Sequence, residues 1–204
     1  MNATAYAMLP AMTLLLVPFA ATARPALYRF DPVHTQVWFS AAHENFSQPQ
    51  GRVRIADGWF TFDPGDWRSA KVDVVIDLTS LDMGDKDWND ALKASGFLDV
   101  ERWPRAHYVS RSVEQTGART GVIHGDLKLL GRTAPVDVAF TLNDIGYDAY
   151  AFSRKAGFSA TATLHRSSFG LTRFPKVVGE DIRVHVEIEG ERQGSVHSAR
   201  PGKH

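Results

Sequence analysis

Cysteine is absent from the sequence of 204 residues. Its absence excludes disulfide-stabilised scaffolds, cysteine zinc sites, iron–sulfur clusters and thiol nucleophiles. Neither sign of charge is in excess, because 23 Lys and Arg residues balance 23 Asp and Glu residues. This neutrality argues against a nucleic-acid-binding protein that relies on a strongly basic surface. Hydrophobic residues make up 44% of the chain, too many for a disordered protein, and the length suits one domain or two small ones.

Motifs for catalysis are also missing. The sequence has no Walker loop, no dinucleotide-binding fingerprint and no G-x-S-x-G turn for a serine nucleophile. Its eight histidines form no pair at metal-ligand spacing, and solvent-exposed side chains are their simplest interpretation. A site assembled from histidines on distant strands stays open at this point. We predict no catalytic residue, no metal site and no cofactor.

Long hydrophobic runs are scarce as well. The uncharged apolar run over residues 9–21 is too short to span a bilayer and fits the hydrophobic part of a signal peptide. Residues 21–23 have the small-x-small form of a cleavage site, although no Lys or Arg precedes the run. The alternative is a buried segment of the mature domain, which Pro10 and Pro18 disfavour. We predict a signal peptide over residues 1–23 and a periplasmic or secreted protein that does not span a membrane.

Most of the remaining chain alternates apolar and polar residues with a period of two, which is typical of strands with one dry and one wet face. The predicted strands cover residues 37–41, 51–62, 72–76, 107–113, 123–129, 136–142, 158–164 and 184–188. A change of parity between Ile55 and Phe60 predicts a bulge near Asp57 and Gly58. Eight such strands close most economically as an antiparallel barrel or a two-sheet sandwich. We predict an all-β domain over residues 24–191 and a flexible polar tail over residues 192–204.

The dry face of the predicted strands mixes bulky side chains with small ones. Ala41, Gly125, Ala160 and Ala162 all fall on this face. Small side chains there leave room inside a barrel, which favours a cavity for one small ligand. The alternative is a lumen filled by the remaining side chains.

The longest break in the alternation is the connection over residues 78–104. Within it, residues 85–95 place Trp88 and Leu92 four positions apart, which is typical of one face of a short helix. Long connections in compact domains often form lids. We predict a lid over the lumen, with Trp88, Leu92 and Phe97 facing inward. The alternative is a plug that simply closes one end of the barrel.

Several short sequence blocks follow one another in a fixed order. The block D-P-V-H-T at residues 31–35 precedes a predicted strand and His43, and G-R follows at residues 51–52. Further blocks are F-L-D-V-E-R-W-P at residues 97–104, G-D-L-K-L-L-G-R-T-A-P-V at residues 125–136, R-S-S-F-G at residues 166–170 and V-G-E-D-I at residues 178–182. In this order the blocks resemble those of the YceI-like polyisoprenoid-binding proteins, and the resemblance extends over roughly residues 28–189.

The resemblance implies an eight-stranded antiparallel, lipocalin-like barrel that holds a long isoprenoid or another amphiphilic chain in an apolar lumen. It also implies export. Many members carry an R-D-x-H-L box, where this chain has N-D-A-L-K at residues 89–93. Asp90 is kept, Asn89 replaces the Arg, and the His is missing. If the box contacts a head group, a quinone, a fatty amide or a neutral prenol is easier to hold here than a diphosphate.

We therefore interpret the protein as a non-enzymatic carrier of a long-chain isoprenoid or quinone-like lipid, with no nucleic-acid partner. The candidate ligand-binding residues combine apolar side chains with polar ones from the family blocks: His34, Phe39, His43, Trp88, Asp90, Leu92, Phe97 and Phe158. One alternative is a stress-related or respiratory accessory protein that uses the barrel as a scaffold for a protein partner. Another is a small lipid-directed enzyme. A homodimer is compatible with a small barrel on general grounds.

Overall fold

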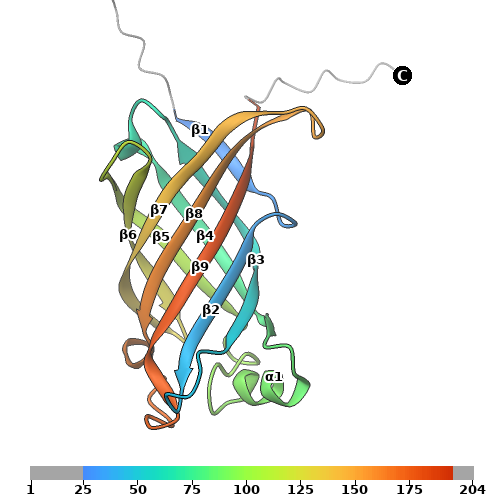
Figure 1. Ribbon diagram of the computed structural model, residues 1–204, viewed down its shortest axis with the longest axis vertical. Coiled ribbons are helices and arrows are strands. Elements are labelled where there is room, and N and C mark those ends of the chain that lie inside the picture. The colour runs from blue at the N-terminus through green and yellow to red at the C-terminus, as the bar shows by residue number, and fades with distance from the viewer. Residues whose placement is uncertain (1–24, 195–204) are drawn as a thin grey trace, which may run out of the picture.

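The computed structural model describes residues 25–194, so the predicted signal peptide and most of the predicted tail lie outside the described residues (Figure 1). The strands are β1 (Ala26–Phe30), β2 (Gln36–His43), β3 (Gln50–Phe62), β4 (Lys71–Asp82), β5 (Arg105–Gln115), β6 (Thr120–Leu129), β7 (Arg132–Asp148), β8 (Ser153–His165) and β9 (Val178–Arg192). The helices are α1 (Lys86–Lys93) and two short 3-10 helices, η1 (Trp67–Ser69) and η2 (Arg166–Phe169). Nowhere within residues 25–194 is a helix long and apolar enough to cross a membrane.

The strands form a closed antiparallel barrel. Eight of them pair in the order β3-β2-β9-β8-β7-β6-β5-β4, and β4 pairs back with β3. One sheet thus closes on itself, which confirms the predicted barrel and excludes the two-sheet sandwich. The register of β3 against β4 shifts between Ile55 and Asp57, where the change of parity predicts a bulge.

A ninth strand, β1, was not predicted from the sequence. It pairs with the end of β3 and with residues 190–192 of β9, while β2 lies between the same two strands farther along the barrel. The two strands therefore share one place in the ring, and the turn over residues 31–35 interrupts the wall between them. With only five residues, β1 is too short to show a period of two.

Aromatic side chains close one end of the barrel. Trp67 of η1 is 4% exposed, and its ring lies 5.2 Å from Phe62 and 5.5 Å from Phe140, centroid to centroid. Phe158 meets the rings of Phe60, Phe62 and Phe140 edge-on at 5.2–5.8 Å. Such edge-to-face pairs add to the stabilisation that ring burial supplies. This aromatic cluster fills the lumen at the end where η1 joins β3 to β4.

The opposite end carries α1, the β2–β3 turn and the β8–β9 loop (Figure 1). The helix begins after Asp85, whose carboxylate accepts a hydrogen bond from the Trp88 N–H at 2.9 Å. None of the α1 side chains is buried. A helix of eight residues depends on tertiary contacts for its stability. The few contacts of α1 therefore make it the element most easily displaced at this end of the barrel.

Candidate ligand-binding cavity

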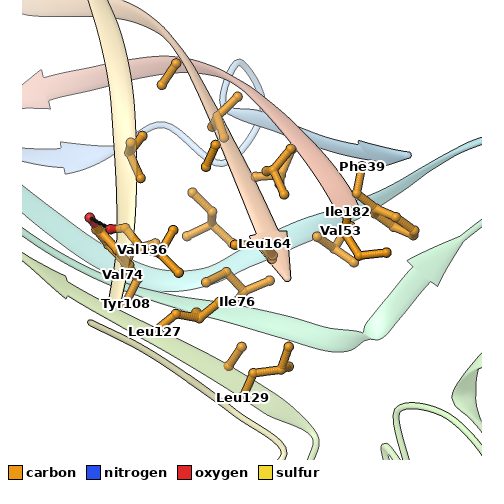
Figure 2. Close-up of a pocket in the computed structure, with 18 of the residues that line it drawn as sticks. Phe39, Val53, Val74, Ile76, Tyr108, Leu127, Leu129, Val136, Leu164 and Ile182 are labelled. Carbon is orange, nitrogen blue, oxygen red and sulfur yellow. Dashed lines mark hydrogen bonds between the residues drawn. The ribbon is translucent and has the colours of Figure 1, made fainter. Parts of the chain in front are cut away.

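The barrel encloses a cavity of about 380 Å³ between the aromatic cluster and α1. Pockets for small molecules measure roughly 300–1,000 Å³. Side chains from β2 to β9 point into it (Figure 2), among them Phe39, Val53, Val74, Ile76, Tyr108, Leu127, Leu129, Val136, Leu164 and Ile182. Inward residues such as Val74 and Val184 are only partly buried because they face open space rather than each other.

The lining of the cavity is almost entirely apolar. Side-chain nitrogen or oxygen atoms come only from His43, Thr61, Trp88, Tyr108 and Arg166 among the described lining residues. The Tyr108 hydroxyl lies 3.1 Å and 3.3 Å from two backbone carbonyls of the wall, and burial raises the pKa of this phenol. Its proton is thus already donated within the protein. The cavity suits a hydrocarbon chain better than a polar ligand.

Arg166 is a buried cation at the mouth, with 5% of its surface exposed. Its Nε donates to the Gly179 carbonyl and its Nη2 to the Val178 carbonyl, both at 3.0 Å. Its Nη1 donates to the carbonyls of Arg173, at 2.9 Å, and Leu171. The guanidinium therefore holds the β8–β9 loop in place rather than presenting its donors to the cavity.

The small inward residues do not all create space. Ala41, Ala160 and Ala162 line the cavity, in agreement with the expectation from sequence. Gly125 does not, because the Tyr108 ring lies directly over it and a Cβ at this position would overlap that ring. The expectation for Gly125 is therefore wrong: the Tyr108 ring from β5 fills the space that the missing side chain leaves.

Aromatic side chains of the β4–β5 connection cover the mouth of the cavity. Trp88, Leu92 and Phe97 line it, which agrees with the predicted inward orientation of all three. The Trp88 ring meets His43 at the end of β2 edge-on, at a centroid distance of 6.2 Å. Phe97 stacks on Phe174 of the β8–β9 loop at 5.5 Å. Aromatic contacts thus join the connection to the end of β2 and to the β8–β9 loop.

Comparison with known proteins now assigns the fold to a family. The sequence-family model of the YceI-like domain matches residues 28–190. The chain belongs to the YceI-like family. A UPF0312 protein of Pseudomonas putida (strain W619) is 33% identical over 176 residues, which cover 85% of this chain and 91% of the relative. A UPF0312 protein of Ectopseudomonas mendocina (strain ymp) is 33% identical over 160 residues, which cover 78% of this chain and 83% of the relative.

Solved structures share the fold at lower identity. BcnA of Burkholderia cenocepacia has a TM-score of 0.67 and 20% identity, over 78% of this chain and 98% of that one. A polyisoprenoid-binding domain from Saccharophagus degradans has a TM-score of 0.63 and 12% identity, over 81% of this chain and 98% of that domain. These likenesses agree with the closed antiparallel barrel described above.

Six of the eight predicted ligand-binding residues line the cavity of this YceI-like barrel: Phe39, His43, Trp88, Leu92, Phe97 and Phe158. Asp90 does not, because it lies between Trp88 and Leu92 in sequence and so falls on the opposite face of α1, where it pairs with Lys86. His34 lies on the turn between β1 and β2, outside the wall, and its side chain is 55% exposed. The mouth position that we expected for these two residues is corrected.

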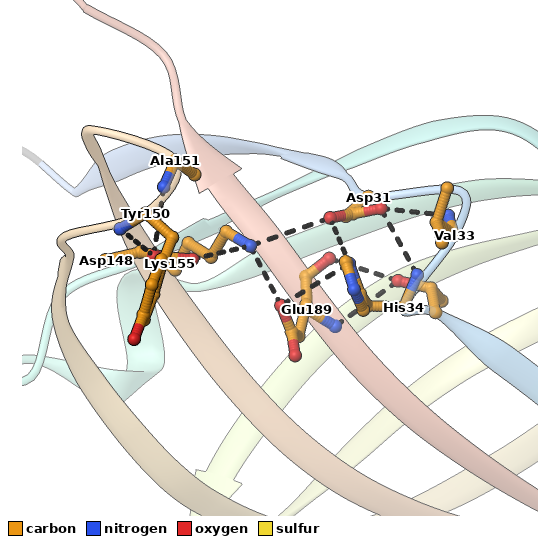
Figure 3. A network of polar contacts seen from close by, with 9 residues as sticks. Asp31, Val33, His34, Asp148, Tyr150, Ala151, Lys155 and Glu189 are labelled. Atoms are coloured by element: carbon orange, nitrogen blue, oxygen red, sulfur yellow. Dashed lines mark hydrogen bonds and ion pairs between the residues drawn. The ribbon is translucent and has the colours of Figure 1, made fainter.

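His34 belongs instead to a network that secures the turn between β1 and β2 (Figure 3). One carboxylate oxygen of Asp31 accepts the backbone N–H groups of Val33 and His34 at 2.8 and 3.2 Å, and the other lies 2.7 Å from His34 Nδ1. The Asp31 N–H and the Thr35 hydroxyl both donate to the Glu189 carbonyl of β9, at 2.8 and 3.0 Å. The family block at residues 31–35 therefore fixes the break in the wall.

Lys155 is the ammonium group that joins this network to Asp148 of β7. Its Nζ lies 3.0 Å from Asp148, 3.1 Å from Glu189 and 3.7 Å from Asp31 (Figure 3). The contacts with Asp148 and Glu189 raise the pKa of this ammonium group. Asp31, His34 and Glu189 also offer three ligand-type atoms within 4.8 Å of one another. Because Lys155 contacts both of these carboxylates and His34 lies against Asp31, an ion-pair network accounts for the cluster.

The pH dependence of unfolding should reveal the Asp31 contribution. Burial acts to raise the pKa of Asp31, but hydrogen bonds from His34 and from two backbone N–H groups outweigh it and hold this pKa at about 2. Since an unfolded Asp titrates near 3.9, this contribution is present above about pH 4 and is lost as the pH falls through about 2. The difference in free energy of unfolding between wild type and Asp31→Asn should shrink from about pH 5 to about pH 2. Urea denaturation measures it, and a difference that stays constant would contradict the assignment.

Sequence reasoning missed several lining residues near the mouth. Ile182 continues the alternation of β9 by one step toward its start, whereas the exposed Glu180 breaks the pattern before Val178. Met83 and Leu171 line the cavity from loops, where no periodic signal exists. Met83 also packs beside Gly51, whose missing side chain leaves room for it.

Proposed function

We propose that the protein binds a long-chain, mainly apolar lipid of the isoprenoid type inside the barrel and carries it outside the cytoplasm. The observation that carries this proposal is the lining of the cavity, which is apolar from the aromatic cluster to the mouth. The polyisoprenoid-binding domain from Saccharophagus degradans, which shares the fold, supports the same class of ligand. Family membership supports a binding role in place of a catalytic one.

The energetics favour a chain over a compact ligand. Each methylene group removed from water contributes about 0.8 kcal/mol. Ordering a flexible chain offsets part of this gain. Because few polar atoms face the cavity, affinity would come from the length of buried hydrocarbon, and selectivity from the mouth.

A neutral head group fits the mouth better than a diphosphate. Asn89 stands where many family members have Arg, and its side chain is used internally. Its Oδ1 accepts the Met83 N–H at 2.6 Å and its Nδ2 donates to Asp82 at 3.2 Å, which ties α1 to the end of β4. Arg166 is likewise occupied by backbone carbonyls. Because Arg166 is the one Lys or Arg among the described residues that line the cavity, a quinone, a fatty amide or a prenol fits this lining without a further cation.

Mass spectrometry of the purified protein tests the carrier proposal. Protein prepared from its own host should show a bound lipid in native spectra, and solvent extraction should release the same molecule. We expect one isoprenoid or similar long chain for each barrel. A barrel that is repeatedly isolated empty, under conditions that preserve lipid in other carriers, would overturn the proposal.

The lid role of α1 predicts the effect of Trp88→Ala. Trp88 is 37% exposed, so its removal should cost the fold little, whereas the mouth loses its largest cover. We expect lipid retention to fall more than the melting temperature does. Trp38→Ala is the matched control, because Trp38 lies on the outer face of β2 against His185. A loss of about 3–5 kcal/mol with unchanged retention per folded molecule would show that the segment is a plug.

Export rests on the apolar run that precedes the barrel. We propose that residues 1–23 are a signal peptide. N-terminal sequencing of the protein from its own host should begin at Arg24. A chain that retains Met1 would overturn this part of the proposal.

A further inference from the structure

We propose that the protein docks on the surface of an anionic lipid bilayer through a face beside the cavity mouth. This docking face consists of Phe46, Arg173, Phe174 and Lys176. The inference rests on the proposed function, because an apolar cargo with little solubility in water must pass between the cavity and a membrane. It adds where that membrane is met and which side chains meet it.

Two exposed phenyl rings mark the docking face. Phe46 is 88% exposed in the turn after β2, and Phe174 is 46% exposed in the loop before β9. The two segments lie side by side, since the Glu44 N–H donates to the Val177 carbonyl at 2.8 Å (Figure 1). Large apolar side chains gathered at one place on a surface indicate an apolar partner. Aromatic side chains such as Phe favour the boundary between lipid head groups and hydrocarbon.

The charges beside these rings favour an anionic bilayer over a neutral one. In the two segments that carry the rings, residues 44–49 and 170–178, the charged side chains are Glu44, Arg173 and Lys176, which leave a net positive charge. The Arg173 guanidinium lies over the Phe174 ring, 5.3 Å from its centroid. A cation next to an exposed ring can meet a lipid phosphate while the ring enters the hydrocarbon. Anionic leaflets attract such cations over about one Debye length.

The docking face also touches the lid. Phe174 stacks on Phe97, and Phe97 lines the cavity. The Arg173 guanidinium packs against Gly96, so a Cβ at that position would lie 2.9 Å from its Nη1. A bilayer that takes up Phe174 competes with this stacking and loosens Phe97 at the mouth. Docking would therefore open the cavity at the place where the lipid is supplied.

The opposite end of the barrel offers a matched control. Tyr150 and Phe152 on the β7–β8 turn are 98% and 80% exposed, but they lie far along the barrel from α1. Phe152 and Phe174 share a left-handed backbone, with φ of 52° and 53°. Asn tolerates this conformation. Phe46→Ser with Phe174→Asn, and Tyr150→Ser with Phe152→Asn, therefore each remove two exposed rings with similar demands on the backbone.

Sedimentation with vesicles tests the docking face. The vesicles contain phosphatidylcholine with about 30% phosphatidylglycerol, or phosphatidylcholine alone. We expect the wild type to bind the anionic vesicles and the Phe46/Phe174 variant to bind them at least about tenfold more weakly, since two rings leave the interface. The Tyr150/Phe152 variant should bind like the wild type. Arg173→Gln with Lys176→Gln should lower binding and its sensitivity to salt.

A second readout separates this inference from the proposed function. Lipid delivered from solvent should bind equally to the wild type and to Phe46→Ser, which leaves the stacking of Phe174 on Phe97 intact, whereas uptake from vesicles should slow only in the variant. If the wild type retains lipid but binds neither kind of vesicle, the docking proposal is overturned and the carrier proposal stays intact. Equal loss in the Tyr150/Phe152 variant would also overturn docking, as would exclusive binding of a soluble protein by this face. Vesicle binding without any lipid uptake would overturn the carrier proposal instead.

Discussion

Replacing Ala162 with Phe is expected to reduce the lipid bound per barrel by more than tenfold while the fold remains stable. Ala162 belongs to the inward set of β8 and lines the cavity. A phenyl ring there would occupy space that the hydrocarbon needs, and it would displace several methylene groups at about 0.8 kcal/mol each. Because the ring enters an existing cavity rather than a packed core, the usual cost of overpacking should be small.

The neighbouring residue provides the control for this substitution. Thr161 precedes Ala162 on β8, is exposed and therefore faces outward. Thr161→Phe adds a ring to the outside of the same strand and should leave lipid retention unchanged. Extraction and quantification of lipid from equal amounts of folded protein would measure both variants. Equal retention in Ala162→Phe and wild type would show that the cargo does not occupy this cavity.

The alternation of side chains made the barrel predictable. On β4, the residues Val72, Val74 and Ile76 face inward as the period of two requires, and β6 and β8 follow the same rule, whereas bulges shift the parity in β3 and β5. A strand that buries one face leaves this signal in its own sequence. The inward face of α1 was predictable for a similar reason, since Trp88 and Leu92 lie four residues apart on one face of the helix.

The positions of His34 and Tyr108 could not be read from the sequence. His34 lies on a turn that leaves the wall. This turn is outside the barrel because β1 and β2 pair with the same two strands, which only the closed sheet shows. Tyr108 fills the space of Gly125 through a contact between neighbouring strands. Both facts depend on register and on the direction of side chains after the sheet closes. The period of two carries neither.

Arg166 is a further residue whose role depends on the closed structure. Arg is seldom fully buried, so its sequence position alone suggests an exposed side chain. In the barrel it reaches two backbone carbonyls of the loop that carries Phe174 and Arg173 and two more at the start of β9. The mouth, the lid contact at Phe97 and the proposed docking face all depend on the shape of this loop.

Replacing Arg166 with Met should therefore destabilise the protein by about 3 kcal/mol or more, since hydrogen bonds from a charged donor contribute about 1.5–3 kcal/mol each and the loop carbonyls lose theirs together. Met keeps much of the side-chain volume, so the loss would report the hydrogen bonds rather than a void. Arg166→Lys retains the charge, but a single ammonium cannot reach carbonyls spread from Leu171 to Gly179, and we expect an intermediate loss. Urea denaturation measures the order wild type, Lys, Met. A Met variant as stable as the wild type would show that solvent satisfies these carbonyls and that the loop holds its shape without Arg166.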